Sequence, residues 1–129
     1  MIKEILLVDD DLDDVGLFQE ALNEVDPLIN FHSASNGAKA LEFLRSMQAA
    51  AIDLIFLDIN MPEVNGWQCL TELKNSPALK QIPVIMYSTS ASKKDEQKAS
   101  GLGAIGIYQK PERFQALKDL LKTLLKDLA

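Results

Sequence analysis

The 129-residue sequence predicts an α/β domain in which five parallel strands form one doubly wound sheet. Short runs of aliphatic and β-branched residues alternate five times with longer segments whose apolar residues recur every three or four positions. No linker, internal repeat or shift of composition divides the chain. We therefore expect a single domain over residues 1–129, with helices on both faces of the sheet.

The five expected strands are short and mostly apolar. They are Ile2–Val8, Ile29–Ala34, Leu54–Leu57, Val84–Tyr87 and Ala104–Tyr108. The first, third and fourth are almost continuously apolar, as is typical of central strands that helices cover on both faces. In the second strand the polar residues Asn30 and His32 alternate with apolar neighbours. This pattern indicates an edge strand, with His32 as a partly exposed edge residue.

Four of the five helical segments carry a clear apolar stripe. The stripes are Val15, Phe18, Leu22 and Val25; Ala40, Leu41, Leu44 and Met47; Trp67, Leu70 and Leu73; and Phe114, Leu117, Leu121, Leu124, Leu125 and Leu128. We expect the connection 48–51 to extend the second helix. The fourth segment, Ala91–Gly103, has few apolar anchors and therefore low local stability. We expect this helix and its loop to form the responsive surface, that is, the part of the surface that moves when the state of the site changes.

The composition excludes several classes of function. Thirteen basic and 19 acidic residues give a net charge of −6, which disfavours binding to nucleic acid or anionic membranes. A single cysteine, Cys69, cannot form an internal disulfide, and a single histidine cannot build a histidine-rich metal site. Lys3 and Glu4 stand where the apolar part of a signal peptide would begin, and no apolar run is long enough to cross a bilayer. We expect a cytoplasmic protein.

Acidic residues follow two of the expected strands. Asp9 and Asp10 come directly after the first strand and Asp58 after the third. A helix cap accounts for Asp11 and Asp13 better than for the Asp9 and Asp10 pair. Two unit charges 4 Å apart repel by about 4 kcal/mol at an effective dielectric constant near 20. A cluster of three carboxylates therefore needs a cation or raised pKa values, and an all-oxygen set suits Mg²⁺.

The fourth and fifth strands bring a hydroxyl and an ammonium to the same edge of the sheet. Ser88 lies at the end of the fourth strand, while Ser90 or Ser92 is the better candidate for capping the next helix. Lys110 follows the fifth strand, as a counter-charge for the carboxylates or as a solvated surface charge. Ligands of such sheets bind at the carboxyl ends of the strands, so we expect one site there.

With these residues the sequence resembles the response regulator receiver domain of two-component signalling, over essentially its whole length. The matching pieces, in the family's order, are Asp9-Asp10 after Ile5–Val8, Leu57–Pro62 with Gly66, Pro83–Ser88 and Lys110-Pro111. The resemblance implies a flavodoxin-like (βα)5 fold with strand order 2-1-3-4-5. The last apolar stripe ends at Leu128, so we expect a stand-alone receiver without an output domain. The Asp9–Asp14 string looks like that of stand-alone receivers found with phytochrome-type kinases.

The resemblance also implies a phosphorylation site and a metal site. A sensor histidine kinase or a phosphotransfer protein would phosphorylate Asp58 in a Mg²⁺-dependent reaction. Asp10, Asp58 and the backbone carbonyl of Asn60 would bind Mg²⁺ directly, and Asp9 would act through water. The domain would catalyse its own phosphorylation and dephosphorylation, as a phosphorelay switch and not as a metabolic enzyme.

Two further positions matter for switching. Ser88 fills the position of the family's switch hydroxyl and Lys110 that of its phosphate-pairing lysine, so both join Asp58 as catalytic candidates. The family's aromatic switch residue, three positions before the lysine, is replaced by Ile107. Tyr108 should face the other side of the sheet because strand residues alternate. The resemblance also implies a cis peptide bond between Lys110 and Pro111.

Output would then pass through contacts with a downstream protein that the sequence does not identify. Leu120 lies just outside the last apolar stripe and is a candidate for a partner or homodimer face. Three alternatives are disfavoured by the sequence. A Mg²⁺-dependent phosphatase would need a second acid where Asn60 stands. A flavodoxin-like cofactor protein would need a Ser-, Thr- or Gly-rich loop after the first strand, where five aspartates stand instead. A degenerate receiver that serves only as a scaffold is disfavoured because no site position is lost.

Overall fold

The structure is a computed structural model that describes residues 1–46 and 51–128. In these ranges five parallel strands form one sheet in the order β2-β1-β3-β4-β5. The strands are β1 (Glu4–Val8), β2 (Asn30–Ala34), β3 (Leu54–Leu57), β4 (Val84–Ser88) and β5 (Gly106–Gln109). The predicted fold class and strand order are confirmed, with β2 at an edge. β1 and β5 each begin two residues later than expected.

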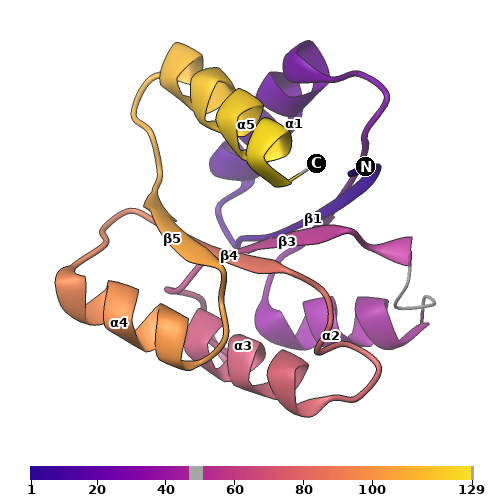
Figure 1. Ribbon diagram of the computed structural model, residues 1–129, viewed down its shortest axis with the longest axis vertical. Helices are drawn as coiled ribbons and strands as arrows, with labels where there is room; N and C mark the ends of the chain where they lie inside the picture. The colour runs from indigo at the N-terminus through magenta and orange to yellow at the C-terminus, as the bar shows by residue number, and fades with distance from the viewer. Residues whose placement is uncertain (47–50, 129) are drawn as a thin grey trace.

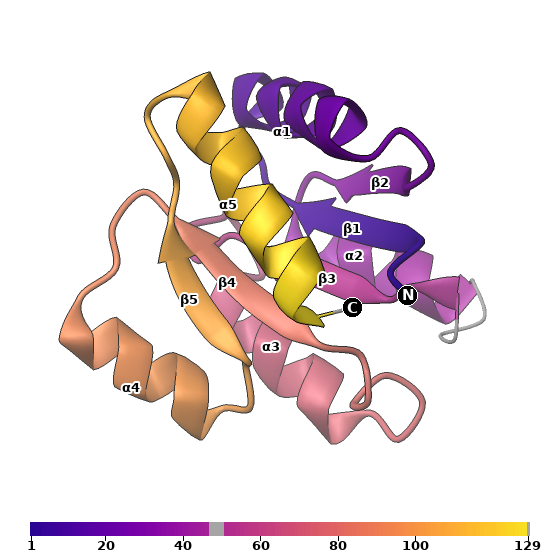
Figure 2. The ribbon, with the colours of Figure 1, turned by 45° about the horizontal axis from the view of Figure 1, so that its top comes forward.

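Helices cover both faces of this sheet (Figures 1 and 2). On one face lie α1 (Leu12–Val25) and α5 (Phe114–Leu128), and on the other α2 (Gly37–Ser46), α3 (Gly66–Asn75) and α4 (Lys93–Gly101). The expected extension of α2 through 48–51 and the stripe position Met47 lie outside the described residues, apart from Ala51. The order reverses between β1 and β3, so the predicted site belongs at the carboxyl ends of these two strands.

The two faces bury separate apolar clusters because successive strand residues point to opposite sides. In β1, Ile5 and Leu7 pack under α1 and α5, whereas Leu6 and Val8 pack under α2 and α3. β1, β3 and β4 are buried along almost their whole length, as the apolar runs predicted. The predicted apolar stripe of α5 is not covered along its whole length, because its last residue, Leu128, is 36% exposed.

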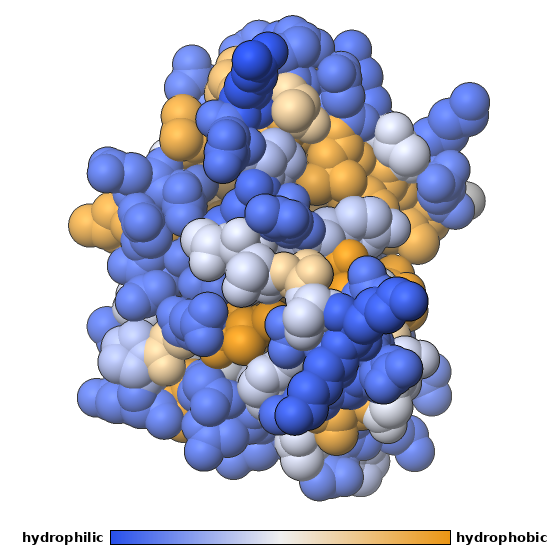
Figure 3. Space-filling view, turned by 90° about the vertical axis from the view of Figure 1, so that its left-hand side faces the viewer, coloured by the Kyte–Doolittle hydropathy of each residue, from blue (hydrophilic) through white to orange (hydrophobic). Residues whose placement is uncertain are grey.

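The two edge regions of the fold are less buried than its centre. Of the residues in α4 only Ala99 is buried, as expected from the weak apolar pattern. Figure 3 views the molecule from the side of α4 and β5 and shows a mainly hydrophilic surface with hydrophobic side chains scattered in it. Ile105 and Tyr108 are among the exposed hydrophobic residues, at 52% and 37%.

Leu120 on α5 is half-buried against the core beneath α1 and α5.

Strand register places the residues that follow the strands. Val8 of β1 pairs with Leu57 of β3, so the next residues along each strand, Asp9 and Asp58, lie side by side. Across the sheet, the backbone N–H of Lys110 donates to the carbonyl of Ser88 at 2.6 Å, which holds the end of β5 against the end of β4. Among the described residues, no helix is both long and apolar enough to span a bilayer.

Candidate metal and phosphorylation site

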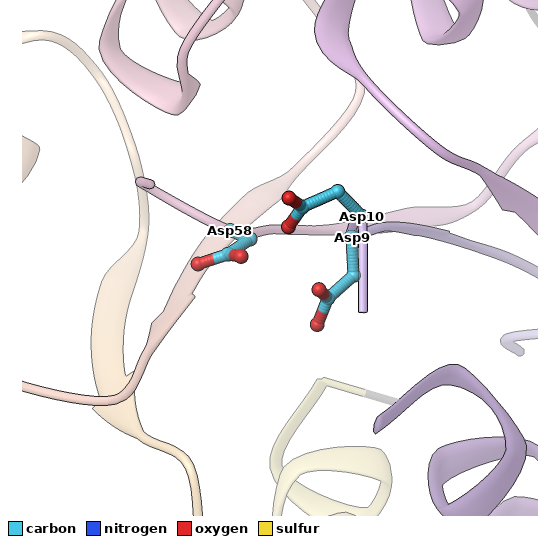
Figure 4. Close-up of side chains that lie close together, drawn as sticks. All are labelled: Asp9, Asp10 and Asp58. Carbon is cyan, nitrogen blue, oxygen red and sulfur yellow. The ribbon is translucent and has the colours of Figure 1, made fainter. Parts of the chain in front are cut away.

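Three carboxylates converge at the carboxyl ends of β1 and β3. Figure 4 shows the side chains of Asp9 and Asp10, from the end of β1, close to that of Asp58 from the end of β3. One oxygen of each carboxylate lies within 4.8 Å of the others. Asp9 and Asp58 are buried, with only 1% and 5% exposed, whereas Asp10 is exposed. The structure therefore brings together the three acids that the sequence singled out.

Backbone hydrogen bonds hold this arrangement. The N–H of Asp58 donates to the carbonyl of Val8 at 2.9 Å, which extends the β1–β3 pairing to the site itself. The Asp9 Oδ1 atom accepts from the N–H of Asp11 at 3.0 Å, and the Asp58 Oδ1 atom accepts a longer contact from the N–H of Asn60 at 3.4 Å. One oxygen of each buried carboxylate is thereby anchored to the backbone.

The loop after Asp58 folds tightly against the site. The N–H of Gly66 donates to the carbonyl of Ile59 at 2.9 Å, so the start of α3 turns back onto the end of β3. A Cβ atom at Gly66 would lie 2.2 Å from the carbonyl oxygen of Asp58, too close for any side chain. Glu63, in the same loop, has a positive φ of 63°. Glycine at position 66 is needed because the backbone of Asp58 occupies the space that a side chain would take.

Lys110 is the counter-charge of the cluster. Its Nζ atom lies 2.8 Å from Asp9 Oδ2, 2.9 Å from Asp14 Oδ2 and 3.6 Å from Asp58 Oδ2. Only 10% of its side chain is exposed, and Nζ also sits over the ring of Tyr87, 5.7 Å from the ring centroid. Of the two interpretations that the sequence allowed, the structure supports a buried counter-charge and not a solvated surface lysine.

Burial and charge act against each other at Asp58. Desolvation, together with the neighbouring charge of Asp9, raises the pKa of its carboxyl from 3.8 to about 6, although Lys110 acts to lower it. Desolvation alone would lower the pKa of the Lys110 ammonium, but contacts with Asp9 and Asp14 outweigh it and raise that pKa. One ammonium thus faces more carboxylates than it can neutralise.

The donor set of the crevice fits a hard divalent cation. The buried Asp9 Oδ2 makes no hydrogen bond, although it is in ionic contact with Lys110. Asp9, Asp10 and Asp58 offer oxygen ligands only, in an arrangement with excess negative charge. Mg²⁺ takes one or two protein carboxylates and keeps several waters, so these residues suit it.

Ser88 lies at the same edge, buried at the end of β4. Its Oγ atom accepts a long contact from the N–H of Ser90 at 3.5 Å. Ser92, one of the two hydroxyl residues considered for the next helix, is the N-cap of α4. Ser88 is therefore the buried hydroxyl residue at the carboxyl end of β4.

The positions near the end of β5 give a mixed outcome. Ile107 packs against the core beneath α2, α3 and α4, and Tyr108 lies over Gly106, so the expected alternation is confirmed. The expectation of a cis bond before Pro111 is wrong, because the described residues contain no cis peptide bond. Even before proline the trans form is favoured by about 0.5–1 kcal/mol. His32 is a partly exposed edge residue, as expected, and lies 3.0 Å from Glu4.

One site residue was not predicted from the sequence. Asp14, in the first turn of α1, hydrogen-bonds the Lys110 Nζ atom, although the two residues are 96 positions apart. From the sequence, a helix cap accounted for Asp11 and Asp13, and Asp11 is indeed the N-cap that accepts from the backbone of residues 13 and 14. The one feature of the sequence that could have pointed to Asp14 is that this turn holds more acidic residues than a helix cap requires.

The fold and site are those of a receiver domain. The chain belongs to the response regulator receiver domain family, which it matches over residues 5–122. Response regulator Rcp1 of Synechocystis sp. (strain PCC 6803) is 35% identical over 93% of this chain and 82% of its own length. A probable cyclic di-GMP phosphodiesterase of Vibrio cholerae is 33% identical over 95% of this chain, which spans only 26% of that relative. The chain spans 54% of the probable transcriptional regulator ycf29 of Pyropia yezoensis.

Solved structures of response regulators resemble the whole chain. The phosphorylated cyanobacterial phytochrome response regulator RcpA superposes with a TM-score of 0.85 at 32% identity, over 98% of this chain and 93% of RcpA. The Mn²⁺-bound form of response regulator Rcp1 gives a TM-score of 0.77 at 30% identity, over 95% and 91% of the two chains. Receiver domains are signalling domains that take phosphoryl groups from histidine kinases and bind Mg²⁺ at an acidic pocket.

Proposed function

We propose that this receiver accepts a phosphoryl group on Asp58 from a sensor histidine kinase or a phosphotransfer protein, in a Mg²⁺-dependent reaction. The observation that carries the proposal is the cluster of Asp9, Asp10 and Asp58, with the Lys110 ammonium beside Asp9 and Asp58. Phosphoryl transfer needs mainly positioning and charge neutralisation, which such a cluster supplies. The donor brings the histidine, so the receiver needs none of its own.

Asp58 acts as the nucleophile of this reaction. One of its carboxylate oxygens forms a bond to phosphorus while the phosphorus–nitrogen bond of the phosphohistidine breaks. The second ring nitrogen of the donor carries a proton before transfer, so the leaving group is a neutral imidazole. Lys110, 3.6 Å from Asp58 Oδ2, offsets negative charge on the product. Ser88 donates its hydroxyl hydrogen to a phosphoryl oxygen and thereby reports phosphorylation. Attack of water on the acyl phosphate returns the free carboxylate.

Asp10, Asp58 and the backbone carbonyl of Asn60 hold Mg²⁺ directly, and Asp9 holds it through water. The bound ion offsets the charge that the carboxylates and the phosphoryl group bring together. The excess negative charge of the crevice supports this ligand set. The Mn²⁺-bound form of Rcp1, a relative at 30% identity, adds support for a divalent ion.

The phosphorylated domain signals through contact with another protein, as a cytoplasmic switch and not as a metabolic enzyme. The likeness to Rcp1 and RcpA favours a phytochrome-type kinase as the source of the phosphoryl group. In a homodimer through the region of Leu120, only the exposed part of this half-buried side chain would be open to a second copy.

The test is treatment with acetyl phosphate followed by intact mass measurement. We expect one phosphoryl adduct on the wild type with Mg²⁺ and none with a chelator. The Asp58→Asn variant should give no adduct, since its amide is not a nucleophile, whereas Asp13→Asn, an exposed carboxylate of α1, should behave as the wild type. An adduct on Asp58→Asn, or none on the wild type with Mg²⁺, would contradict the proposal.

A further inference from the structure

Lys110 has a third carboxylate partner that the proposed function does not use. Asp14 Oδ2 accepts a hydrogen bond from Lys110 Nζ at 2.9 Å and thereby links the first turn of α1 to the end of β5. Its neighbour Asp13 is exposed and forms no ion pair within residues 1–46 and 51–128. Two adjacent acids of the same helical turn therefore have different surroundings.

The Asp14 carboxylate is not required to begin the helix. Asp11 is the N-cap of α1, and its side chain accepts from the backbone N–H groups of residues 13 and 14. A negative charge near the start of a helix is favourable in itself, but Asp13 supplies that effect equally well. What distinguishes Asp14 from Asp13 is the contact with Lys110.

The three partners of Lys110 also differ in what else they do. Asp9 and Asp58 belong to the carboxylate cluster that suits Mg²⁺, whereas Asp14 does not. A divalent ion in that cluster attracts the two shared carboxylates and repels the ammonium. When the cluster holds a divalent ion, the ion offsets the attraction of Asp9 and Asp58 for Lys110. It does not offset the attraction of Asp14.

We propose that Asp14 is a positioning residue that keeps the Lys110 ammonium beside Asp58 while the carboxylate cluster holds its metal. This inference rests on the proposed function, since it assigns a role in the same reaction. Asp14 touches neither phosphorus nor metal and acts through Lys110. The Tyr87 ring, 5.7 Å from Lys110 Nζ, borders the ammonium on another side.

The first measurement is the reactivity of the Lys110 amine. Pulse acetylation with sulfosuccinimidyl acetate and peptide mass spectrometry give the rate at Lys110, with exposed Lys122 as internal reference. In the wild type and in Asp13→Ala, Lys110 should react slowly with or without Mg²⁺. In Asp14→Ala with Mg²⁺ its rate should rise about tenfold, as expected for the loss of one charge-assisted hydrogen bond. Asp14→Glu should restore part of the protection.

The second measurement is the rate constant of phosphorylation at saturating Mg²⁺ and acetyl phosphate. Loss of a negative charge alone should favour an anionic donor, and Asp13→Ala gives the size of that effect. Loss of positioning should instead lower the rate in Asp14→Ala, by about tenfold relative to Asp13→Ala.

The two measurements separate the inference from the proposed function. Equal Lys110 reactivity in Asp14→Ala and Asp13→Ala with Mg²⁺ would overturn the role of Asp14, as would equal phosphorylation rates. If the wild type formed no adduct at all, the proposed function would fail, and the reactivity of Lys110 would still decide whether Asp14 positions it.

Discussion

At the scale of single residues, the site residues that were predictable are those at or just after the carboxyl end of a strand. Asp9, Asp58 and Ser88 could be assigned to one edge because the carboxyl ends of parallel strands meet there, whatever the helices do. Asp14 could not, because its role depends on how the first turn of α1 lies against the end of β5, 96 positions away. Sequence periodicity carries no information about such a contact.

The raised pKa of Asp58 predicts a pH-dependent cost in the folded protein. Its pKa is about 6 in the folded state against an ordinary value of 3.8, so folding favours the protonated carboxyl. Without metal, this cost is absent below pH 3.8, grows as pH rises toward 6 and is complete above it. Asp58→Asn removes it, so we expect the variant to have the larger free energy of unfolding at pH 7.

Urea denaturation of both proteins in chelator, from pH 4 to pH 8, measures this difference. The advantage of Asp58→Asn should shrink toward zero as pH falls to about 4, because the wild-type carboxyl is then protonated as well. Asp13→Asn, which removes the same charge from an exposed position, should show no such pH dependence. A constant difference between wild type and Asp58→Asn over the whole range would show that ionisation of Asp58 is not its cause.

At the scale of elements, α4 differs from the other helices in how little it buries. Ala99 is its one buried residue, and its N-terminus is held by a capping box between Ser92 and Asp95. Elements with few buried contacts open at low free energy. The loop before α4 is coupled to the site, because the N–H of Ser90 contacts the Ser88 hydroxyl at 3.5 Å.

Movement of the Ser88 hydroxyl toward a phosphoryl group would break its contact with Ser90 and release the loop before α4. We therefore expect amide hydrogen exchange in residues 91–102 to change when a beryllofluoride phosphoryl analogue and Mg²⁺ are added. The α2 helix, which buries Ala40, Leu41 and Leu44, serves as the reference and should keep its protection. Identical exchange of residues 91–102 in both states would rule out α4 as the responsive surface.

The difference in burial between central and edge elements also explains why the elements were easier to predict than the residues at which they begin and end. The central strands were recognisable because β1, β3 and β4 are buried on both faces and therefore continuously apolar. β5 has no such pattern: its residues are half-buried or exposed, and its expected start at Ala104 lies two positions before its observed start at Gly106. Helix α4 was found mainly as the interval between two strands.

At the scale of the whole molecule, part of the net charge of −6 is gathered at the ends of β1 and β3. The fold brings Asp9 and Asp58 together because their strands pair in register, and burial then prevents water from screening them fully. A ligand that binds only the folded arrangement must stabilise the fold. The metal-free protein should thus be less stable than its apolar core alone would allow.

Mg²⁺ should therefore raise the free energy of unfolding, by about 2.7 kcal/mol at a concentration one hundred times its dissociation constant. Thermal and urea denaturation over a Mg²⁺ series, against KCl of equal ionic strength, separates binding from screening of the acidic surface. Asp10→Asn should lose most of the Mg²⁺ effect, because Asp10 belongs to the cluster yet is exposed, so its substitution leaves the core intact. Glu20→Gln, an exposed acid on α1, should retain the effect. If KCl stabilised the wild type as much as Mg²⁺, or Asp10→Asn responded like the wild type, the carboxylate cluster would not be the binding site.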